Sequence, residues 1–249
     1  MKRVLITGGG KRLGAIIAQH VHENGWVPIL HYGTSKNDAH RLAQKLSITT
    51  LQADLSDPDA VTPLIEKSSQ MAGGPLTALI NCASIFEHDR PETTSQKALA
   101  KHYQINTIAP ILLSQAFAAQ ATGVQDPVIV NILDQKLHNL HPDHFSYTLS
   151  KAALETATHM IAQSFAPLVR AVGVAPGYTL PAPGETEEAF AGKAAGANPL
   201  RRRLDPKHIA QAVQFCLDCP AITGQTILAD NGEHLVPTMR DISFQTDLT

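Results

Sequence analysis

The sequence has little cysteine, few aromatic residues and almost no net charge. Its three cysteines, Cys82, Cys216 and Cys219, are too few and too odd in number for a disulfide framework, so reduced thiols in a cytosol are expected. A formal net charge of -2 gives no reason to expect a polyanion or an anionic membrane as partner. With one Trp and no basic–aromatic interleaving, the chain lacks the usual signatures of nucleic-acid binding.

Long apolar runs are also missing. No stretch reaches the roughly 18 apolar residues that a membrane span requires. The apolar run within the N-terminal MKRVLITGGG is too short for the core of a signal peptide. What remains is a chain of 249 residues, 43% hydrophobic and 17% charged. These values predict a cytoplasmic globular protein that can bury a sizeable core.

Short apolar, β-rich segments alternate with segments of helical periodicity along almost the whole chain. The expected strands cover residues 3–7, 27–32, 49–53, 77–81, 128–133, 169–175 and 226–229. The first expected helix begins at Arg12 and is closed by Gly25. Further helices are expected over 37–46, from Asp57-Pro58 onward, over 96–121, over 145–165 and over 205–217, the last beginning with Asp205-Pro206. A kink is allowed at Pro110 within the helix expected over 96–121. This order predicts an α/β fold. We expect a single Rossmann-type, doubly wound domain over residues 1–249, with a parallel sheet of about seven strands and helices on both faces.

Residues 178–200 depart from this alternation. The segment is rich in Ala, Gly and Pro, has weak apolar periodicity and follows the end of an expected strand. Ligands of open α/β sheets bind at such strand ends, so we expect a lid over a substrate. A surface insertion without function is the alternative interpretation.

Tyr147 and Lys151 stand four residues apart in the helix expected over 145–165, and Asp134 lies thirteen residues before the Tyr. The four-residue spacing places Tyr147 and Lys151 on one helix face. An ammonium beside a phenol is expected to lower the pKa of the phenol and to make it a usable acid near neutral pH. These three residues are therefore the first catalytic candidates.

A glycine-rich turn joins the first expected strand to the first expected helix, and residues 7–14 read TGGGKRLG. Glycines at this place allow a tight turn and let a pyrophosphate approach the helix N-terminus. Arg12 stands where a third glycine is common. A purely structural turn is the alternative. As cofactor contacts we expect Gly8, Lys11, Arg12 and Leu13.

The second expected strand ends in HYGTSK, residues 31–36, without the Asp or Glu that usually accepts a hydrogen bond from the ribose 2′-OH of NAD. Donors and positive charge suit a 2′-phosphate instead. NADPH is therefore favoured over NADH, and solvated loop residues are the plainer interpretation. The residues expected around the phosphate are Arg12, His31, Ser35 and Lys36, and Tyr32 is expected as a further cofactor contact.

These motifs resemble those of the short-chain dehydrogenase/reductase family over roughly residues 1–235. Further matches are Asp54-Leu55, Asn81-Cys82-Ala83-Ser84, Asn106, Pro176-Gly177, Thr223-Gly224-Gln225 and Asp230-Asn231-Gly232. The resemblance implies cofactor contacts from Asp54, Leu55, Asn81, Ala83, Lys151, Pro176 and Gly177. It also implies that Asn106 helps to hold a proton-relay water and that the chain forms a homotetramer through its long helices.

Asp134 departs from the wider family, in which most members have Ser at this position. A Ser hydroxyl polarises a carbonyl, whereas a carboxylate would repel the negative charge that develops on the carbonyl oxygen. A carboxylic acid, or a carboxylate beside a protonatable ring nitrogen, suits reduction of a C=N bond. The Asp-Tyr-Lys set therefore resembles the pteridine reductase branch.

That branch resemblance implies reduction of a dihydropterin, dihydromonapterin or dihydrofolate to the tetrahydro form with NADPH. It implies that Phe86 stacks on the pterin. The substrate contacts it implies are Ser84, Phe86, Tyr147 and Tyr178.

Two other functions stay open. A carbonyl reductase of the same family, acting on a ketone or an acyl thioester, is opposed by Asp134 and Phe86. A non-catalytic NADPH-sensing protein is opposed by the presence of Asn106, Tyr147 and Lys151.

His138, His141 and His144 recur at three-residue spacing. Pro142 breaks the helix that would align them, so a substrate contact or a solvated loop is expected rather than a metal site. The basic run at residues 201–203 is expected to be solvated, with attraction of an acidic substrate tail as the alternative.

Overall fold

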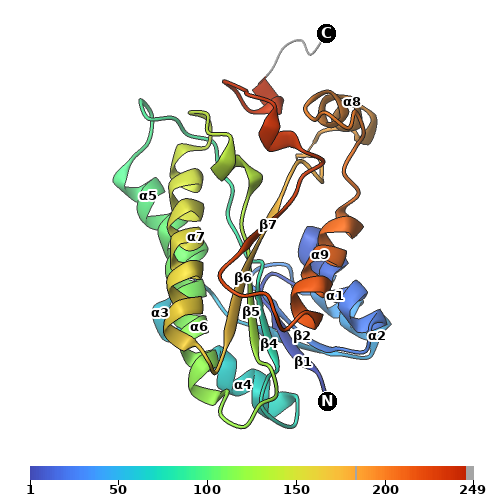
Figure 1. Cartoon of the computed structure of the whole chain (residues 1–249), viewed down its shortest axis with the longest axis vertical. Helices are drawn as coiled ribbons and strands as arrows, with labels where there is room; N and C mark the ends of the chain where they lie inside the picture. Colours follow the sequence, from blue (N-terminus) through green and yellow to red (C-terminus); the bar gives the residue numbers. More distant parts are fainter. Residues whose placement is uncertain (183, 245–249) are drawn as a thin grey trace.

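Seven parallel strands form the central sheet of the computed structural model, which describes residues 1–182 and 184–244 (Figure 1). The strands are β1 (Arg3–Ile6), β2 (Val27–Tyr32), β3 (Thr49–Gln52), β4 (Ala78–Asn81), β5 (Val128–Ile132), β6 (Arg170–Pro176) and β7 (Thr226–Ala229). They lie in the order β3-β2-β1-β4-β5-β6-β7. The expected strands and fold class are confirmed. The strand order reverses between β1 and β4, the point where doubly wound sheets bind ligands.

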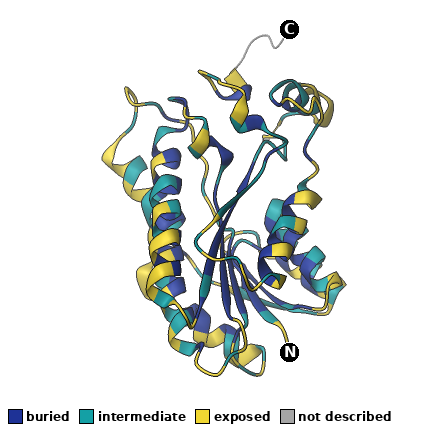
Figure 2. Ribbon diagram, viewed as in Figure 1, coloured by how far each residue is buried: buried dark blue, intermediate teal, exposed yellow. Residues whose placement is uncertain are grey.

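Helices cover both faces of this sheet. On one face lie α1 (Arg12–Glu23), α2 (Lys36–Leu46) and α9 (Pro206–Asp218). On the other lie α3 (Pro58–Val61), α4 (Pro63–Met71), α5 (Gln96–Tyr103), α6 (Ala109–Gln120) and α7 (Phe145–Phe165). Figure 2 shows buried strands between helices whose outer surfaces are exposed. Burial of the apolar helix faces against the sheet supplies the main driving force for this arrangement.

Two helix starts read from the sequence are confirmed. The Asp57 side chain accepts a hydrogen bond of 3.0 Å from the Asp59 N–H, and Pro58 occupies the first turn. Asp205 accepts one of 2.8 Å from the Lys207 N–H, again with Pro next in the chain. Each carboxylate satisfies a backbone donor that the helix leaves unpaired.

The helix expected over 96–121 is interrupted. A π-helical turn (Gln104–Ile108) separates α5 from α6. The interruption lies directly before Pro110, where the sequence allows a break, and Pro110 has no N–H to donate to the preceding helical turn. The turn buries Asn106 and Thr107, and the Thr107 hydroxyl donates to the Ser150 carbonyl of α7 at 2.7 Å. The π-helical turn is thus hydrogen-bonded to α7.

The segment 178–200 contains a helix that the sequence did not predict, α8 (Glu187–Gly196). Thr186 caps it by accepting a hydrogen bond of 3.2 Å from the Ala189 N–H. Phe190 and Ala194 are buried with Ile242 near the far end of the chain. Because that partner is distant in sequence, local periodicity could not reveal the helix.

After β7 the chain crosses the end of the sheet where the strands reach their carboxyl termini (Figure 1). It forms short 3-10 turns at Glu233–Leu235 and Ile242–Phe244. We call residues 238–244 the C-terminal strap. Across the described ranges, 1–182 and 184–244, the structure contains no helix both long and apolar enough to cross a membrane.

Candidate active site

Asp134, Tyr147 and Lys151 come together at the carboxyl end of β5. The Tyr147 hydroxyl donates a hydrogen bond of 2.6 Å to Asp134 Oδ2. The Lys151 ammonium donates to the Ile132 carbonyl at 2.7 Å and lies 5.9 Å from the centre of the Tyr147 ring. Residues chosen for their spacing alone are thus neighbours in space.

The protonation of this group differs from what the spacing predicts. The pKa of Tyr147 is raised well above its usual value, by burial and then by the negative charge of Asp134, so the expected lowering by Lys151 is wrong for this structure. Burial also raises the pKa of Asp134, against the opposing hydrogen bond from Tyr147. Burial lowers the pKa of Lys151 to about 8. Burial therefore disfavours the charged form of each of the three groups.

Asn106 fastens the segment after β4 to α7. Its Oδ1 accepts hydrogen bonds from the Ile85 N–H at 2.9 Å and the Ser84 hydroxyl at 3.1 Å. Its Nδ2 donates to the Ile85 carbonyl and the Ser150 hydroxyl, both at 3.0 Å. All hydrogen-bonding positions of the amide are occupied by the protein. The side chain therefore fixes Ser84 and Ile85, and its role near a relay water stays a prediction.

Phe86 lies beside the catalytic candidates. Its ring stands edge-on to the Tyr147 ring at 4.6 Å between centroids and stacks on the His144 ring at 3.9 Å. The residue is nevertheless 54% exposed. Tyr178, the first residue of the predicted lid, is directed to the C-terminal strap, where its hydroxyl donates to Asp241 Oδ2 at 3.2 Å. An exposed flat ring at the site supports the stacking role predicted for Phe86, which stays a prediction, as does substrate contact by Tyr178.

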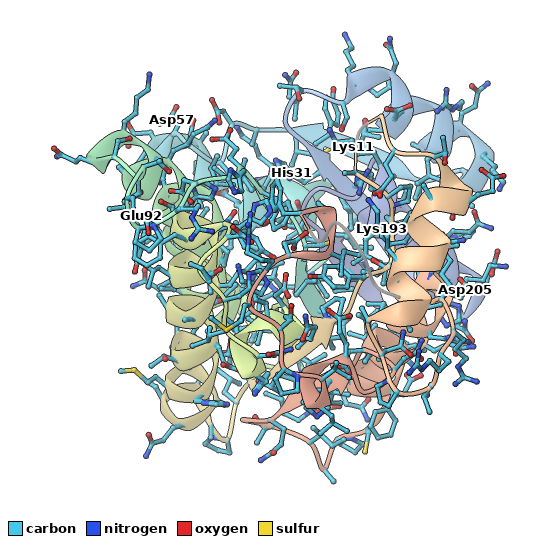
Figure 3. All side chains as sticks on the ribbon, turned by 90° about the horizontal axis from the view of Figure 1, so that it is seen from above. Lys11, His31, Asp57, Glu92, Lys193 and Asp205 are labelled. Carbon is cyan, nitrogen blue, oxygen red and sulfur yellow. The ribbon has the colours of Figure 1, made fainter. Side chains whose placement is uncertain are left out.

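The turn after β1 fits a pyrophosphate. Gly8 has φ +64°, and a Cβ at that position would lie only 2.9 Å from the Ala83 Cα. A Cβ at Gly14 would lie 2.2 Å from the Gly8 carbonyl oxygen. No acidic residue occupies the first turn of α1, so its unpaired N–H groups favour an anion. Seen from above, Glu92 lies on the left of the molecule, Lys11 to the right of its centre, and His31 between them (Figure 3).

His31 does not have the role expected for it. It is 1% exposed. Its Nδ1 accepts a hydrogen bond of 3.2 Å from the Gly8 N–H, which leaves Nε2 to donate to the Ala53 carbonyl at 3.0 Å. Burial lowers the pKa of the ring, so the ring is neutral near pH 7. His31 fixes the glycine turn, and the expectation that it offers a donor or a positive charge to a 2′-phosphate is wrong.

Other residues predicted around the 2′-phosphate, and Tyr32, are placed differently. Ser35 precedes α2 without a side-chain capping bond, and Lys36 is exposed beside it. Tyr32 is buried, with its hydroxyl 3.3 Å from the His40 Nε2. Arg12 adopts φ +50° and donates through Nη2 to the Pro181 carbonyl at 3.0 Å. Ser35 and Lys36 thus have side chains available for a phosphate, whereas Arg12 contacts the predicted lid.

Asp54 and Leu55 follow β3. The exposed Asp54 carboxylate accepts hydrogen bonds from the Ser56 N–H at 2.9 Å and the Ser56 hydroxyl at 2.7 Å, and these bonds lower its pKa. Leu55 is buried in the core on the α4 side of the sheet. The contact of this pair with the cofactor stays a prediction.

Asn81 and Ala83 lie at the end of β4. Asn81 Nδ2 donates to Asn131 Oδ1 at 2.8 Å, while the buried Oδ1 of Asn81 has no protein partner. The Ala83 N–H donates to the Thr7 hydroxyl at 3.0 Å. Thr7 thereby holds the end of β4 beside the glycine turn. The contacts of Asn81 and Ala83 with the cofactor stay predictions.

Glu233 is a buried carboxyl group that the sequence did not reveal as part of the site. It accepts hydrogen bonds from Gln135 Nε2 and, at 2.9 Å, from the Tyr178 N–H. Burial, followed by the nearby charge of Asp134, raises its pKa to about 9. A Cβ at Gly177 would lie 2.5 Å from Glu233 Oε2, so Pro176-Gly177 lies against this carboxyl group. The one signal available was an acid directly after Asp230-Asn231-Gly232.

The three histidines before α7 have different surroundings. His138 lies 3.4 Å from Glu155, His141 is buried, and His144 stacks on Phe86. Within residues 1–182 and 184–244, no group of three His, Cys, Asp or Glu side chains is arranged to hold a metal ion.

Comparison with known proteins gives one family. Residues 10–234 match the family model described as Enoyl-(Acyl carrier protein) reductase, a model of short-chain dehydrogenases/reductases. The dihydromonapterin reductase of Citrobacter koseri is 29% identical over 234 residues, which cover 93% of this chain and 96% of that protein. The dihydromonapterin reductase of Klebsiella pneumoniae is 27% identical over the same lengths.

Solved structures agree with this similarity. The FolM alternative dihydrofolate reductase 1 from Brucella canis, complexed with NADP, is 32% identical, with a TM-score of 0.87 over 94% of each chain. The Brucella suis protein, also complexed with NADP, is 31% identical, with a TM-score of 0.86 over 94% of this chain and 95% of that chain. A putative betaketoacyl-ACP reductase is 27% identical, with a TM-score of 0.84 over 94% of this chain and 98% of the other.

Proposed function

The chain belongs to the short-chain dehydrogenase/reductase family, and from this premise we propose that it reduces a C=N bond of a dihydropterin with NADPH. The observation that carries the proposal is the hydrogen bond of 2.6 Å between Tyr147 and Asp134. A carboxyl group here can hold a proton for a ring nitrogen, whereas it would oppose negative charge on a carbonyl oxygen. Relatives named as dihydromonapterin and dihydrofolate reductases, similar over nearly the whole chain, support a pterin substrate.

NADPH, when bound, supplies the hydride. In our proposal the turn from Gly8 to Leu13 holds its pyrophosphate, Ser35 and Lys36 hold its 2′-phosphate, and Lys151 holds its nicotinamide ribose. The glycine geometry and the uncapped start of α2 support this assignment. The NADP complexes of the two Brucella proteins support the choice of dinucleotide.

The chain's own residues manage the proton. Asp134, with its pKa raised by burial, gives a proton to the ring nitrogen and regains one from Tyr147 across their hydrogen bond. The Lys151 ammonium, 5.9 Å from the Tyr147 ring, favours the transient phenolate. Phe86 holds the flat substrate by stacking. The overall reaction adds one hydride to carbon and one proton to nitrogen, and the Tyr147 phenolate takes its proton back from solvent.

Carbonyl reduction is the second candidate, supported by the similarity to a putative betaketoacyl-ACP reductase. A single assay separates the candidates: NADPH oxidation is followed with dihydrobiopterin, dihydrofolate, dihydromonapterin and a panel of ketones. We expect turnover of at least one dihydropterin and little of the ketones. Turnover of ketones alone would assign carbonyl reduction, and tight NADPH binding without turnover would assign a sensor. A higher kcat/KM with NADH than with NADPH would overturn the cofactor assignment.

We also propose a cytosolic homotetramer that pairs through the long helices. Exposed apolar side chains on the turn before α6, on α6 and on α7 support this arrangement: Ile108, Ile111, Leu149 and Met160. Light scattering coupled to size exclusion tests it, and a monomer at micromolar concentration would contradict it.

A further inference from the structure

A row of five aromatic rings runs from the catalytic Tyr147 to the C-terminal strap. Phe86 stands edge-on to Tyr147 and stacks on His144, with 3.9 Å between centroids and 19° between the ring planes. His88 meets His144 edge-on at 5.3 Å and lies 4.4 Å from Phe244 of the strap. The row thus connects the segment after β4, the start of α7 and the end of the described chain.

Asp143 holds the strap in this position. It is fully buried, and its Oδ2 accepts hydrogen bonds from Arg240 Nε at 2.8 Å and the Asp241 N–H at 3.0 Å. Its Oδ1 accepts from Arg90 Nη1 at 2.7 Å. On the opposite side, the Tyr178 hydroxyl donates to Asp241. Charge-assisted bonds in a buried place are strong, so the strap is a fixed part of the site.

Two phenylalanine rings of the row keep open surface. Phe86 is 54% exposed and Phe244 is 37% exposed. Large aromatic side chains fixed at a site yet open to solvent indicate a surface that a ligand covers. Since Phe86 is the residue proposed to stack on the pterin, a group attached to the pterin can continue along the row towards Phe244.

We propose that this row binds the side chain of the pterin and that Phe244 makes the site selective for an aromatic side chain, such as the aminobenzoyl group of a dihydrofolate. Ring edges and faces attract another flat ring, while a short polyol chain gains no ring contact there. The inference rests on the proposed pterin reduction and names the substrate class within it.

The test compares dihydrofolate with dihydromonapterin as substrates of the wild-type protein, Phe244→Ala and Phe215→Ala. Phe215 is the matched control, because it is a similarly exposed Phe on α9, outside the row. In Phe244→Ala we expect the kcat/KM ratio of dihydrofolate to dihydromonapterin to fall about tenfold. In Phe215→Ala the ratio should stay within about twofold of the wild-type value.

A second probe is p-aminobenzoylglutamate, which carries the side chain without the pterin. We expect it to bind wild type in a calorimetric titration and to bind Phe244→Ala more weakly. Phe244→Leu keeps apolar bulk without a ring, so it should show the same loss and serves if the Ala variant is unfolded. A wild-type ratio in a folded Phe244 variant overturns the selectivity and leaves pterin reduction in place. A wild-type protein that reduces no dihydropterin overturns both.

Discussion

The Tyr147 hydroxyl donates a hydrogen bond of 2.6 Å to Asp134 Oδ2, and this bond joins the two titratable oxygens of the candidate catalytic cluster. Burial raises the pKa of both groups, and the charge of Asp134 raises that of Tyr147 further. Because the two groups interact strongly, the loss of a proton from one depends on whether the other is charged. The protonation of the pair therefore depends on both residues.

Removing either member of the pair should stop the proton transfer. We expect Tyr147→Phe and Asp134→Asn each to lower kcat for dihydropterin reduction by about 100-fold or more, because each breaks the route to the ring nitrogen. NADPH affinity, measured by fluorescence titration, should change by less than about threefold, since neither side chain is assigned to the cofactor phosphates. Wild-type turnover in either variant would contradict the assignment.

Asp134→Ser tests what selects the substrate. A Ser hydroxyl can donate to a carbonyl oxygen but holds no proton for a ring nitrogen. We expect pterin reduction to fall by about 100-fold while reduction of small ketones appears or increases. The measurement is kcat/KM with dihydropterins and with the ketone panel. Retention of full pterin activity alongside good ketone reduction would show that Asp134 does not select the substrate.

His31 should support cofactor binding through the backbone rather than through charge. His31→Ala leaves the partly buried Gly8 N–H and Ala53 carbonyl without their partner, so we expect a loss of about 2 kcal/mol in the free energy of unfolding and a rise of about tenfold in the KM for NADPH. The control is His208→Ala, an exposed His on α9. Equal stability and equal KM in His31→Ala and wild type would contradict this role.

The proximity of Asp134, Tyr147 and Lys151 can be predicted from the sequence because their spacing along the chain is short. Tyr147 and Lys151 share one helix face at four-residue spacing, and Asp134 follows shortly after the preceding strand, where it caps a 3-10 turn. The strands were readable for the same reason, since a buried parallel strand is a short continuous apolar run. Where spacing along one helix or strand determines the position of a residue, the sequence is sufficient to predict that position.

The functions of His31 and Glu233 were not readable, because their partners come from distant segments. His31 bonds to backbone groups of Gly8 and Ala53, and a pattern of residue types carries no information on such partners. The prediction that Lys151 lowers the pKa of Tyr147 fails for a similar reason. Burial and Asp134 outweigh the nearby ammonium, and burial is a property of the folded chain.

Glu233 should make the stability of the protein depend on pH. Its pKa is about 9 in the folded chain against 4.5 for an ordinary Glu, so the folded state binds this proton more tightly than the unfolded state. That advantage is complete below pH 4.5 and is lost as the pH rises towards 9. We therefore expect this carboxyl group to lower the free energy of unfolding by roughly 1 kcal/mol per pH unit between pH 6 and 9.

Glu233→Gln isolates this effect, because the amide has nearly the same shape and no ionisable proton. Urea unfolding at pH 6, 7, 8 and 9 should give a clearly smaller decline for Glu233→Gln than for wild type. Glu188→Gln, at an exposed position in the first turn of α8, removes an acid without a buried proton and should keep the wild-type decline. If Glu233→Gln and Glu188→Gln declined in parallel with wild type, Glu233 would be ionised in the folded chain. Its bonds to Gln135 and Tyr178 would then hold a carboxylate, not a carboxylic acid, beneath Asp134.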